Sequence, residues 1–298
     1  MAQNGKKIAL SIIIANYNRK EWLKLCLKAL ERQNSELLCE TEVIVVDDGS
    51  TDGACEMIKT YNELPNFIYL FQQNKGPASA RNSGIKKARA DYVAFIDNDS
   101  IVFDDWLEMI FRNRNKISDK IVGINGDSQP FPETTNDLST VLGKYLYGPD
   151  NWGVSNNLIY KKEIILRFGM FDESFPYPAC EDFDLAYRIK KTGLDLIYCP
   201  DIRIYHPHET NWSVFKRKWI IHGYSFRHFC AKNIKKYPAS IIYFFIKEIS
   251  DFFIYLLIAP YIITMRRYSK EYIYFFRAYY TLYGMLLQQQ KSQTKDIK

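Results

Sequence analysis

The sequence predicts an α/β fold with a mainly parallel central sheet, followed by a C-terminal helical appendage. Two observations carry this prediction. In the first half of the chain, short apolar runs alternate with stretches of helical periodicity, which is typical of right-handed crossovers between parallel strands. After residue 211 the chain becomes basic and aromatic, and its helical pattern is broken near Pro238 and Pro260. We therefore expect a first domain at residues 1–211 and a helical tail at residues 212–298.

The elements of the first domain are expected to follow one another closely. Strands are predicted at Ile8 to Ala15 and in TEVIVVD, NFIYLFQQ and DYVAFID, with helices in KEWLKLCLKALERQ, DGACEMIKTYNEL and GPASARNSGIKKA. Further on, NNLIYKKEIILRF predicts a strand and a short helix. A helix from about Glu181 should stop at Gly193, before a strand from Leu196 to Cys199. Residues 131–156 are rich in Pro and Gly and are expected to form a loop over the carboxyl edge of the sheet.

Composition indicates a globular protein with two differently charged parts. The chain has 298 residues, of which 47% are hydrophobic and 25% charged, which argues against disorder. Residues 1–211 hold 25 basic and 30 acidic residues, whereas residues 212–298 hold 15 and 4 and carry 22 of the 46 aromatic residues. This asymmetry suggests chemistry in the first part and an anionic partner for the tail.

Cysteine spacing and the N-terminal residues indicate the cellular compartment of the protein. The six cysteines show no CxxC or other ligand-like spacing, which favours thiols in a reducing cytoplasm over a disulfide framework or a structural zinc site. Residues 1–7 lack the pattern of a secretory signal. We therefore expect a protein that is not secreted.

Polar side chains follow three of the predicted strands where each strand ends. Asn16 to Arg19 follow the first, Asp47 to Ser50 the second, and Asp97 to Asp99 the fourth. The carboxyl ends of parallel strands share one edge, where ligands collect and helix N-termini can bind anions. Because burying an unpaired carboxylate costs several kcal/mol, the acidic cluster predicts a cation. The edge thus suits a phosphorylated ligand bridged by a metal.

Six stretches resemble family-2 glycosyltransferases, which have the Rossmann-like GT-A fold. In order, they are SIIIANYNR, VIVVDDGSTD, GPASARNSGI, DYVAFIDND, FGMFDESF and EDFDLAYRIKKTG, and they cover roughly residues 8–210. One departure is Ala15, where the family usually has proline; we expect it to alter loop stiffness rather than chemistry. The resemblance implies inverting transfer of a sugar from a nucleotide-diphosphate donor, with a UDP-sugar favoured, assisted by Mn²⁺ or Mg²⁺.

The resemblance also implies roles for individual residues. Metal ligands would be Asp99 above all, with Asp97 and with His206, which is preferred to His208. Hard cations do favour such oxygen ligands, although Asp97 to Asp99 could instead cap a helix beginning near Phe103. The donor would contact Ala15, Tyr17, Asn18, Arg19, Asp48, Gly76, Arg81, Asn82, Asp97 and Asn98.

The acidic start of EDFDLAYR has two interpretations. It could simply be a first helical turn whose charge suits the helix dipole. The resemblance implies instead that Asp182 is the general base that deprotonates the acceptor hydroxyl, with Glu181 as an orienting or acceptor-contacting residue. Asp184 follows Asp182 by two residues, about 200° around the helix, and should face elsewhere.

The tail predicts contact with a surface rather than passage through it. Its longest uncharged stretch, Phe252 to Met265, has 14 residues, fewer than the roughly 20 needed to span a bilayer. Aromatic residues flanked by Lys and Arg favour interfacial helices on an anionic membrane. The alternative is a helical cap or dimer interface, which leaves a homo-oligomer open. Nucleic-acid binding is not expected, because apolar stretches separate the basic residues.

Together these features predict a cytoplasmic enzyme at the inner face of the membrane. It would add sugar to a glycan or lipid-linked acceptor in cell-surface polysaccharide synthesis. Two alternatives stay open: a catalytically silent nucleotide- or glycan-binding protein of the same fold, and a membrane-surface scaffold.

Overall fold

The computed structural model describes residues 7–61, 63–132, 153–207, 211–236 and 270–286, together with residues 242, 246, 249, 250 and 253. The chain separates into two compact units. The first comprises Met1–Ser174 and Glu181–His208, and the second Phe175–Cys180 and Glu209–Lys298. The domain boundary expected at 211/212 stays a prediction; in this division the segment Phe175–Cys180 groups with the second unit. The predicted loop at 131–156 and His208 fall largely or wholly outside the described residues.

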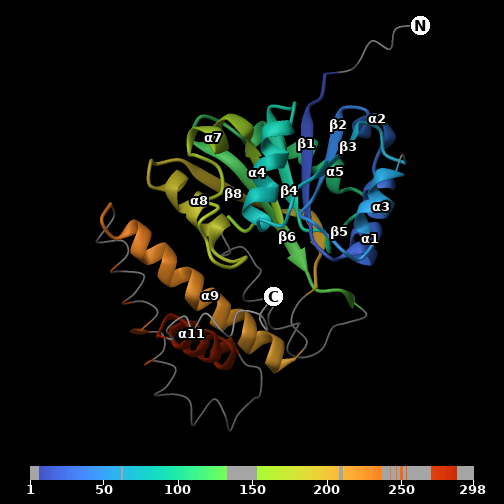
Figure 1. Ribbon diagram of the computed structural model, residues 1–298. Coiled ribbons are helices and arrows are strands. Elements are labelled where there is room, and N and C mark those ends of the chain that lie inside the picture. Colours follow the sequence, from blue (N-terminus) through green and yellow to red (C-terminus); the bar gives the residue numbers. More distant parts are fainter. Residues whose placement is uncertain are drawn as a thin grey trace, which may run out of the picture. The chain divides into compact units, whose positions relative to one another are not determined.

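An eight-stranded sheet forms the centre of the first unit, in the order β3-β2-β1-β4-β7-β6-β8-β5 (Figure 1). Neighbouring strands from β3 to β4 run parallel, as do β6 and β8, whereas β7 is antiparallel to β4 and β6, and β5 is antiparallel to β8. The mainly parallel α/β fold is thus confirmed. The strands are β1 (Leu10–Asn16), β2 (Thr41–Asp47), β3 (Phe67–Phe71), β4 (Tyr92–Ile96), β5 (Ile101–Val102), β6 (Ile121–Gln129), β7 (Asn157–Lys161) and β8 (Asp195–Tyr205).

Helices cover both faces of this sheet. Successive strand residues point to opposite faces, so Ile12 and Ile14 of β1 belong to one buried cluster and Ile13 to the other. The first cluster includes side chains from α1 (Lys20–Glu31), α2 (Ser35–Leu38), α3 (Ala54–Lys59) and α5 (Trp106–Asn113), which η1 (Arg114–Lys116) follows. The second includes side chains from α4 (Pro77–Lys87), α7 (Lys162–Arg167) and α8 (Glu181–Lys190).

Strand β6 is the main element that the sequence did not predict. Gly123 and Gly126 interrupt its apolar pattern, and glycine ordinarily weakens a strand. In the structure, a Cβ atom on Gly123 would collide with the backbone oxygen of Ile159, and one on Gly126 with the side chain of Asn157. The two glycines are therefore explained by close packing against β7, which a local pattern does not reveal.

Among the described residues of the second unit, α9 (Trp212–Asn233) and α11 (Lys270–Leu286) form a helical hairpin. The helices touch backbone to backbone, because a Cβ atom on Gly223 would meet the carbonyl oxygen of Thr281, and one on Gly284 that of Ile220. Among the described residues, every helix is too short or too polar to cross a bilayer. The uncharged stretch at 252–265 lies outside that part of the chain, apart from residue 253.

Candidate active site

The three polar strand ends meet at one edge of the sheet, as expected. Asn98, after β4, donates its amide to Asn16 Oδ1 at 2.7 Å, and Asn16 in turn donates to Ser50 Oγ at 3.1 Å. Asn16 is 1% exposed, so this hydrogen-bonded chain crosses from the end of β4 over β1 to the turn after β2. A buried amide with both ends satisfied fixes the spacing of the three loops.

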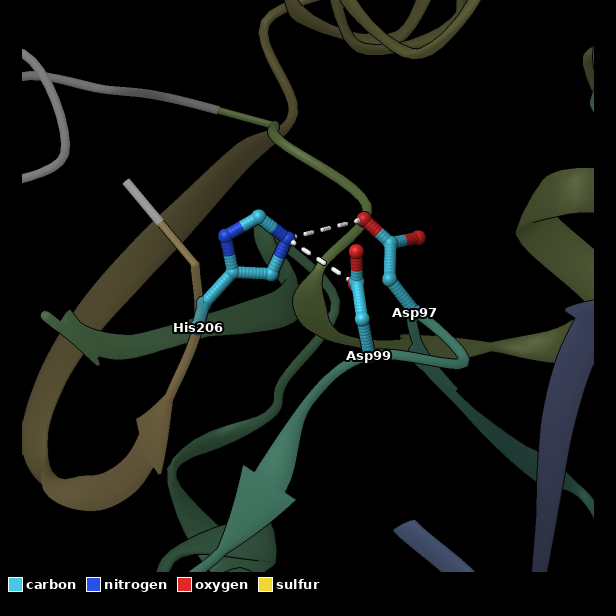
Figure 2. A group of neighbouring side chains, drawn as sticks. All are labelled: Asp97, Asp99 and His206. Carbon is cyan, nitrogen blue, oxygen red and sulfur yellow. Dashed lines mark ion pairs between the residues drawn. The ribbon is translucent and has the colours of Figure 1, made fainter. Parts of the chain in front are cut away.

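Asp97, Asp99 and His206 form a group able to hold a metal ion. Figure 2 shows the three side chains pointing toward one another, the aspartates from the turn after β4 and the histidine from just after β8. His206 Nε2 lies 3.5 Å from Asp97 Oδ2 and 3.3 Å from Asp99 Oδ1, and one ligand atom from each residue lies within 4.8 Å of the others. The backbone N–H of His206 donates to the carbonyl of Gln129 at 2.9 Å, which fixes the histidine beside β6.

The donor set fits a divalent cation. Two carboxylates suit Mg²⁺ or Mn²⁺, and the imidazole nitrogen favours the transition metal. Burial by itself would lower the pKa of His206, but the hydrogen bonds and negative charge of Asp97 and Asp99 raise it to about 9. Burial likewise opposes ionisation of Asp97, yet His206 and Arg81 hold the pKa of that carboxyl below its usual range.

Arg81 of α4 connects this group to the start of α8. Its guanidinium donates to Asp97 Oδ1 at 3.0 Å and to Glu181 Oε1 at 2.8 Å, and both Arg81 and Glu181 are buried. Burial and the neighbouring charge of Asp182 raise the pKa of Glu181 to about 7, although Arg81 counteracts them. Arg81 thus holds Glu181 in place; the role of Glu181 as an orienting residue stays a prediction.

Asp182 stands in the first turn of α8 with its carboxylate fixed. Its Oδ2 accepts from the backbone N–H of Ser155 at 3.0 Å and from the Ser155 hydroxyl at 3.3 Å, and its Oδ1 accepts from the N–H of Phe183 at 2.8 Å. Asp184 is fully buried and pairs with Arg188 at 2.8 Å. The two aspartates hence face different surroundings, and only Asp182 keeps partial exposure.

Asp48, which directly follows β2, contacts the loop between β3 and α4, where Gly76 lies. Asp48 is 3% exposed, and its carboxylate accepts from the N–H groups of Lys75 and Gly76 at 2.9 and 2.8 Å, and from Gln72 Nε2 at 2.7 Å. Gly76, with φ 90°, is the residue before α4, whose first position is Pro77. Asp48 thus holds this loop in place; its contact with a nucleotide base stays a prediction.

The remaining predicted donor residues lie in two places. Ala15 sits near the end of β1, Tyr17 is 46% exposed, and Asn18 accepts from Thr51 N at 2.7 Å with a left-handed φ of 51°. Arg19 Nη1 lies 3.8 Å from Asp99 Oδ2, beside the metal group. Asn82 is buried farther inside and exchanges hydrogen bonds with the backbone of Phe171. Asn82 therefore links α4 to the segment after α7 that contains Phe171.

Two site features were not predicted from the sequence. Ser155 holds Asp182 from the loop before β7, and Arg81 joins the metal group to Glu181. Ser155 lies in a stretch with no regular pattern, so no local signal identifies it. Arg81 was expected near the nucleotide, but a pairing between α4 and α8 is visible only in three dimensions.

The chain is similar to known glycosyltransferases. The family model described as Glycosyl transferase family 2 matches residues 11–175. The chain is 25% identical over 233 residues to the poly(ribitol-phosphate) beta-glucosyltransferase of Bacillus spizizenii, covering 70% of this chain and 37% of that one. Alignments to two further curated glycosyltransferases span 33% and 20% of their lengths.

Two solved structures share the fold. The mannosyltransferase PcManGT of Pyrobaculum calidifontis, solved with GDP-Man and Mn²⁺, superposes with a TM-score of 0.59 at 15% identity, covering 94% of this chain and 72% of that one. The S. aureus protein TarS, solved with UDP-GlcNAc, gives a TM-score of 0.57 at 19% identity, covering 76% and 66%. Likeness at this level of identity shows the GT-A fold alone.

Proposed function

Because the chain belongs to glycosyltransferase family 2, we propose that it transfers a sugar, with inversion, from a nucleotide-diphosphate donor to a glycan or lipid-linked acceptor. The observation that carries the proposal is the chain of side chains from the Asp97, Asp99 and His206 group through Arg81 to Glu181, next to Asp182. It joins a group of side chains that would hold a cation to a carboxylate fixed by Ser155. These are the two functions that displacement of a nucleotide diphosphate by a hydroxyl needs.

The proposed displacement occurs in one step. The acceptor oxygen attacks the anomeric carbon from the face opposite the leaving diphosphate, so that the new glycosidic bond forms as the old carbon–oxygen bond breaks. Asp182 takes the proton of the acceptor hydroxyl, and the electron pair leaves with the diphosphate. A divalent cation held by Asp97, Asp99 and His206 would stabilise the charge on that leaving group.

Three other residues prepare the site. Arg81 keeps Asp97 and Glu181 in place from one buried guanidinium. Ser155 fixes Asp182 Oδ2 through its N–H and its hydroxyl. Such preorganised contacts contribute because they need no rearrangement when charge develops. The presence of Asp182 and of a complete metal group disfavours the catalytically silent alternative.

For the donor we favour a UDP-sugar with Mn²⁺ or Mg²⁺. One structural neighbour was solved with UDP-GlcNAc and another with GDP-Man and Mn²⁺, so either nucleotide is compatible with the fold. For the acceptor we favour a cell-surface polysaccharide or its lipid-linked precursor. The name of the B. spizizenii relative, a poly(ribitol-phosphate) beta-glucosyltransferase, supports this class.

A screen of nucleotide sugars tests the proposal directly. The protein is heated with each of a panel of UDP- and GDP-sugars, with and without Mn²⁺, and release of free nucleotide is then measured for those that bind. A ligand that binds only the folded protein raises its melting temperature. We expect a shift that needs both sugar nucleotide and metal, followed by turnover. Binding without turnover, with water or any soluble glycan as acceptor, would favour the silent alternative.

The helical hairpin leads us to propose attachment to the inner face of the membrane. Exposed apolar side chains on α11 are Tyr279, Tyr283 and Leu286, with Leu286 80% exposed. Exposed basic residues are Lys216 and Arg217 of α9 and Lys235 just after that helix. Apolar and basic surface in one hairpin suits an anionic bilayer. We expect the protein to co-sediment with vesicles containing phosphatidylserine and only weakly with vesicles of phosphatidylcholine; a salt-independent dimer that ignores both would favour the interface alternative.

A further inference from the structure

A short segment of the first unit, residues 153–156, lies directly before β7 and holds the proposed base. Ser155 binds Asp182 Oδ2 through its backbone N–H at 3.0 Å and through its hydroxyl at 3.3 Å. The segment, the strand β6 and the helix α8 all belong to this one unit. Whatever fixes the segment therefore also fixes the carboxylate of the base.

Strand β6 binds this segment through one buried amide, that of Asn125. Asn125 Oδ1 accepts from the backbone N–H of Gly153 at 2.9 Å, and Asn125 Nδ2 donates to the carbonyl oxygen of Val154 at 3.4 Å. The Asn125 side chain is 7% exposed. Both ends of the amide thus bind the backbone of the two residues before Ser155, and no polar group of this amide is left unpaired by its burial.

Asn125 occupies a place where packing alone would favour an apolar side chain. It lies opposite Leu158 of β7, and directly opposite residues of antiparallel strands share a face of the sheet. Leu158 belongs to the second buried cluster, together with Leu185 and Ile189 of α8. Burying an amide on such a face costs free energy unless the amide is hydrogen-bonded. The polarity of residue 125 is therefore explained by the segment that it binds.

Helix α8 contacts the same segment from another side. Gly153 has a left-handed φ of 85°, which glycine adopts without strain, and a Cβ atom on Gly153 would lie 2.3 Å from the Cβ atom of Ala186. Ala186 follows Asp182 by four residues, so the two share one side of α8. Asn156 Nδ2 donates to Ser128 Oγ of β6 at 3.1 Å, and both residues are buried. The segment is thus fixed between β6 and the side of α8 that carries the base.

We propose that Asn125 is a positioning residue for the reaction: by holding Gly153 and Val154 it fixes Ser155, and through Ser155 the direction of the Asp182 carboxylate. This rests on the proposed function. Asn125 acts through the segment and needs to touch neither substrate nor metal. Strand β6 pairs with β8, whose end carries His206, so Asn125 sets the base relative to the sheet that also positions the metal group.

The test uses the full-length protein, with Asn125→Ala removing both hydrogen bonds to the segment. The matched control is Asn113→Ala. Asn113 is also 7% exposed and its amide donates to the carbonyl oxygen of Met109 at 2.8 Å, but it lies in α5, on the other face of the sheet. For each variant we measure metal-dependent nucleotide release across a range of donor concentrations, Mn²⁺ affinity by calorimetry, and hydrogen exchange at the backbone amide of Ser155.

We expect Asn125→Ala to lower kcat about tenfold, within the effect of a small misplacement of a reacting group, while donor KM and Mn²⁺ affinity stay unchanged. The Ser155 amide should exchange faster, although Asn125 binds its neighbours in the chain. Asn113→Ala should lose comparable thermal stability but keep the wild-type kcat and the wild-type exchange at Ser155. A parallel loss of donor affinity, equal damage to kcat in Asn113→Ala, or unchanged kcat and exchange in Asn125→Ala would each overturn the proposal.

A second variant, Asn125→Ser, covers the case in which Asn125→Ala folds poorly. The serine hydroxyl leaves fewer polar groups unpaired, but it is too short to reach both Gly153 and Val154. We expect kcat to fall about threefold, because the segment is held less firmly, with donor KM again unchanged. A wild-type kcat together with wild-type exchange at Ser155 would count against the proposal.

Ser155→Ala tests whether Asn125 and Ser155 act through one contact. It removes the hydroxyl bond to Asp182 and should lower kcat by itself. The double variant with Asn125→Ala should lose less than the product of the two single losses, because the effects of coupled residues are not additive in free energy. Losses that multiply would contradict the proposal. If the wild type releases no nucleotide from any sugar nucleotide, the proposed function fails, and the exchange of the Ser155 amide in Asn125→Ala then decides whether Asn125 holds the segment.

Discussion

The first unit and the helical unit differ in the interactions that hold their buried residues together. At the sheet edge, buried charges are paired with opposite charges, as in Arg81 with Asp97 and Glu181. In the hairpin, Gly223 and Gly284 let the two backbones touch, and aromatic rings such as Trp212 and Phe276 pack edge-on at 5.4 Å. Charged networks fix residue identities, because breaking a buried pair costs several kcal/mol, whereas close packing tolerates apolar exchange of similar volume. Functional residues are therefore easier to predict from sequence in the first unit than in the helical unit.

Among the substitutions that test this difference between the two units, Asp99→Ala should have the largest effect, because it removes one carboxylate of the metal group. We expect metal-dependent turnover to fall by about 10³-fold or more, because charge on the leaving diphosphate loses several kcal/mol of stabilisation. Nucleotide release at fixed Mn²⁺ measures this. The control is Asp104→Ala, because the exposed carboxylate of Asp104 pairs with Arg32 at the surface. Comparable turnover in Asp99→Ala and wild type would show that Asp99 is not a metal ligand.

A smaller loss is expected from Asp182→Asn, which preserves shape and removes the base. The value of kcat should fall by about 10²-fold, the usual scale for a general base, while donor affinity measured by calorimetry with Mn²⁺ stays near that of the wild type. Asp104→Ala again serves as control. A collapse of donor affinity with a high residual rate would make Asp182 a binding residue instead.

In the helical unit, Gly284→Ala tests whether close packing supports the hairpin. The added methyl group would collide with the backbone of Ile220, so we expect a loss of about 1–3 kcal/mol in the stability of that unit. Hydrogen exchange on α9 should accelerate, while Mn²⁺ binding to the first unit stays intact. The control is Ala231→Ser, at an exposed site on α9. A glycine such as Gly193 would not serve, because its φ of 84° makes any substitution there strained. Unchanged exchange would show that the helices can separate at no cost.

The most gradual effect should be the pH dependence of metal affinity. The pKa of His206 is raised to about 9, so below that pH the metal must displace a proton from the ring. Mn²⁺ affinity should consequently rise about tenfold per pH unit up to about pH 9 and then level off, measured by calorimetry in buffers of different ionisation enthalpy. In His206→Asn the slope should be lost along with part of the affinity. A flat profile in the wild type would mean that His206 does not bind the metal.

Part of the site's geometry agrees with expectations drawn from the sequence. The resemblance to family-2 glycosyltransferases implied Asp97, Asp99 and His206 as metal ligands, and the structure brings the three side chains within reach of one ion. The helix start at Glu181 and the separate orientation of Asp184 were also predicted correctly. These features depend on short-range order: strand ends, helix periodicity and the chemistry of carboxylates.

What the sequence did not predict depends on pairing across long distances. β6 was not predicted because Gly123 and Gly126 are explained by close packing against the neighbouring strand β7, and not by the pattern of β6 itself. The ties of Arg81 to Glu181 and of Ser155 to Asp182 join segments far apart in the chain. The grouping of Phe175–Cys180 with α9 likewise needs the packed hairpin. None of these leaves a local pattern, since each is a property of two segments together.

The metal group draws its ligands from two distant places, the turn after β4 and the end of β8, and this bears on how the protein folds. A cation cannot be held by all three ligands until the last strand has joined the sheet, because closing so long a loop is part of the cost of folding. Mn²⁺ added during refolding should thus leave the early rate of collapse unchanged and slow unfolding instead, since it stabilises only the completed state. The ion would then bind last and stabilise the completed sheet. After its removal by a chelator, β8 should unfold before the parallel strands β1 to β4.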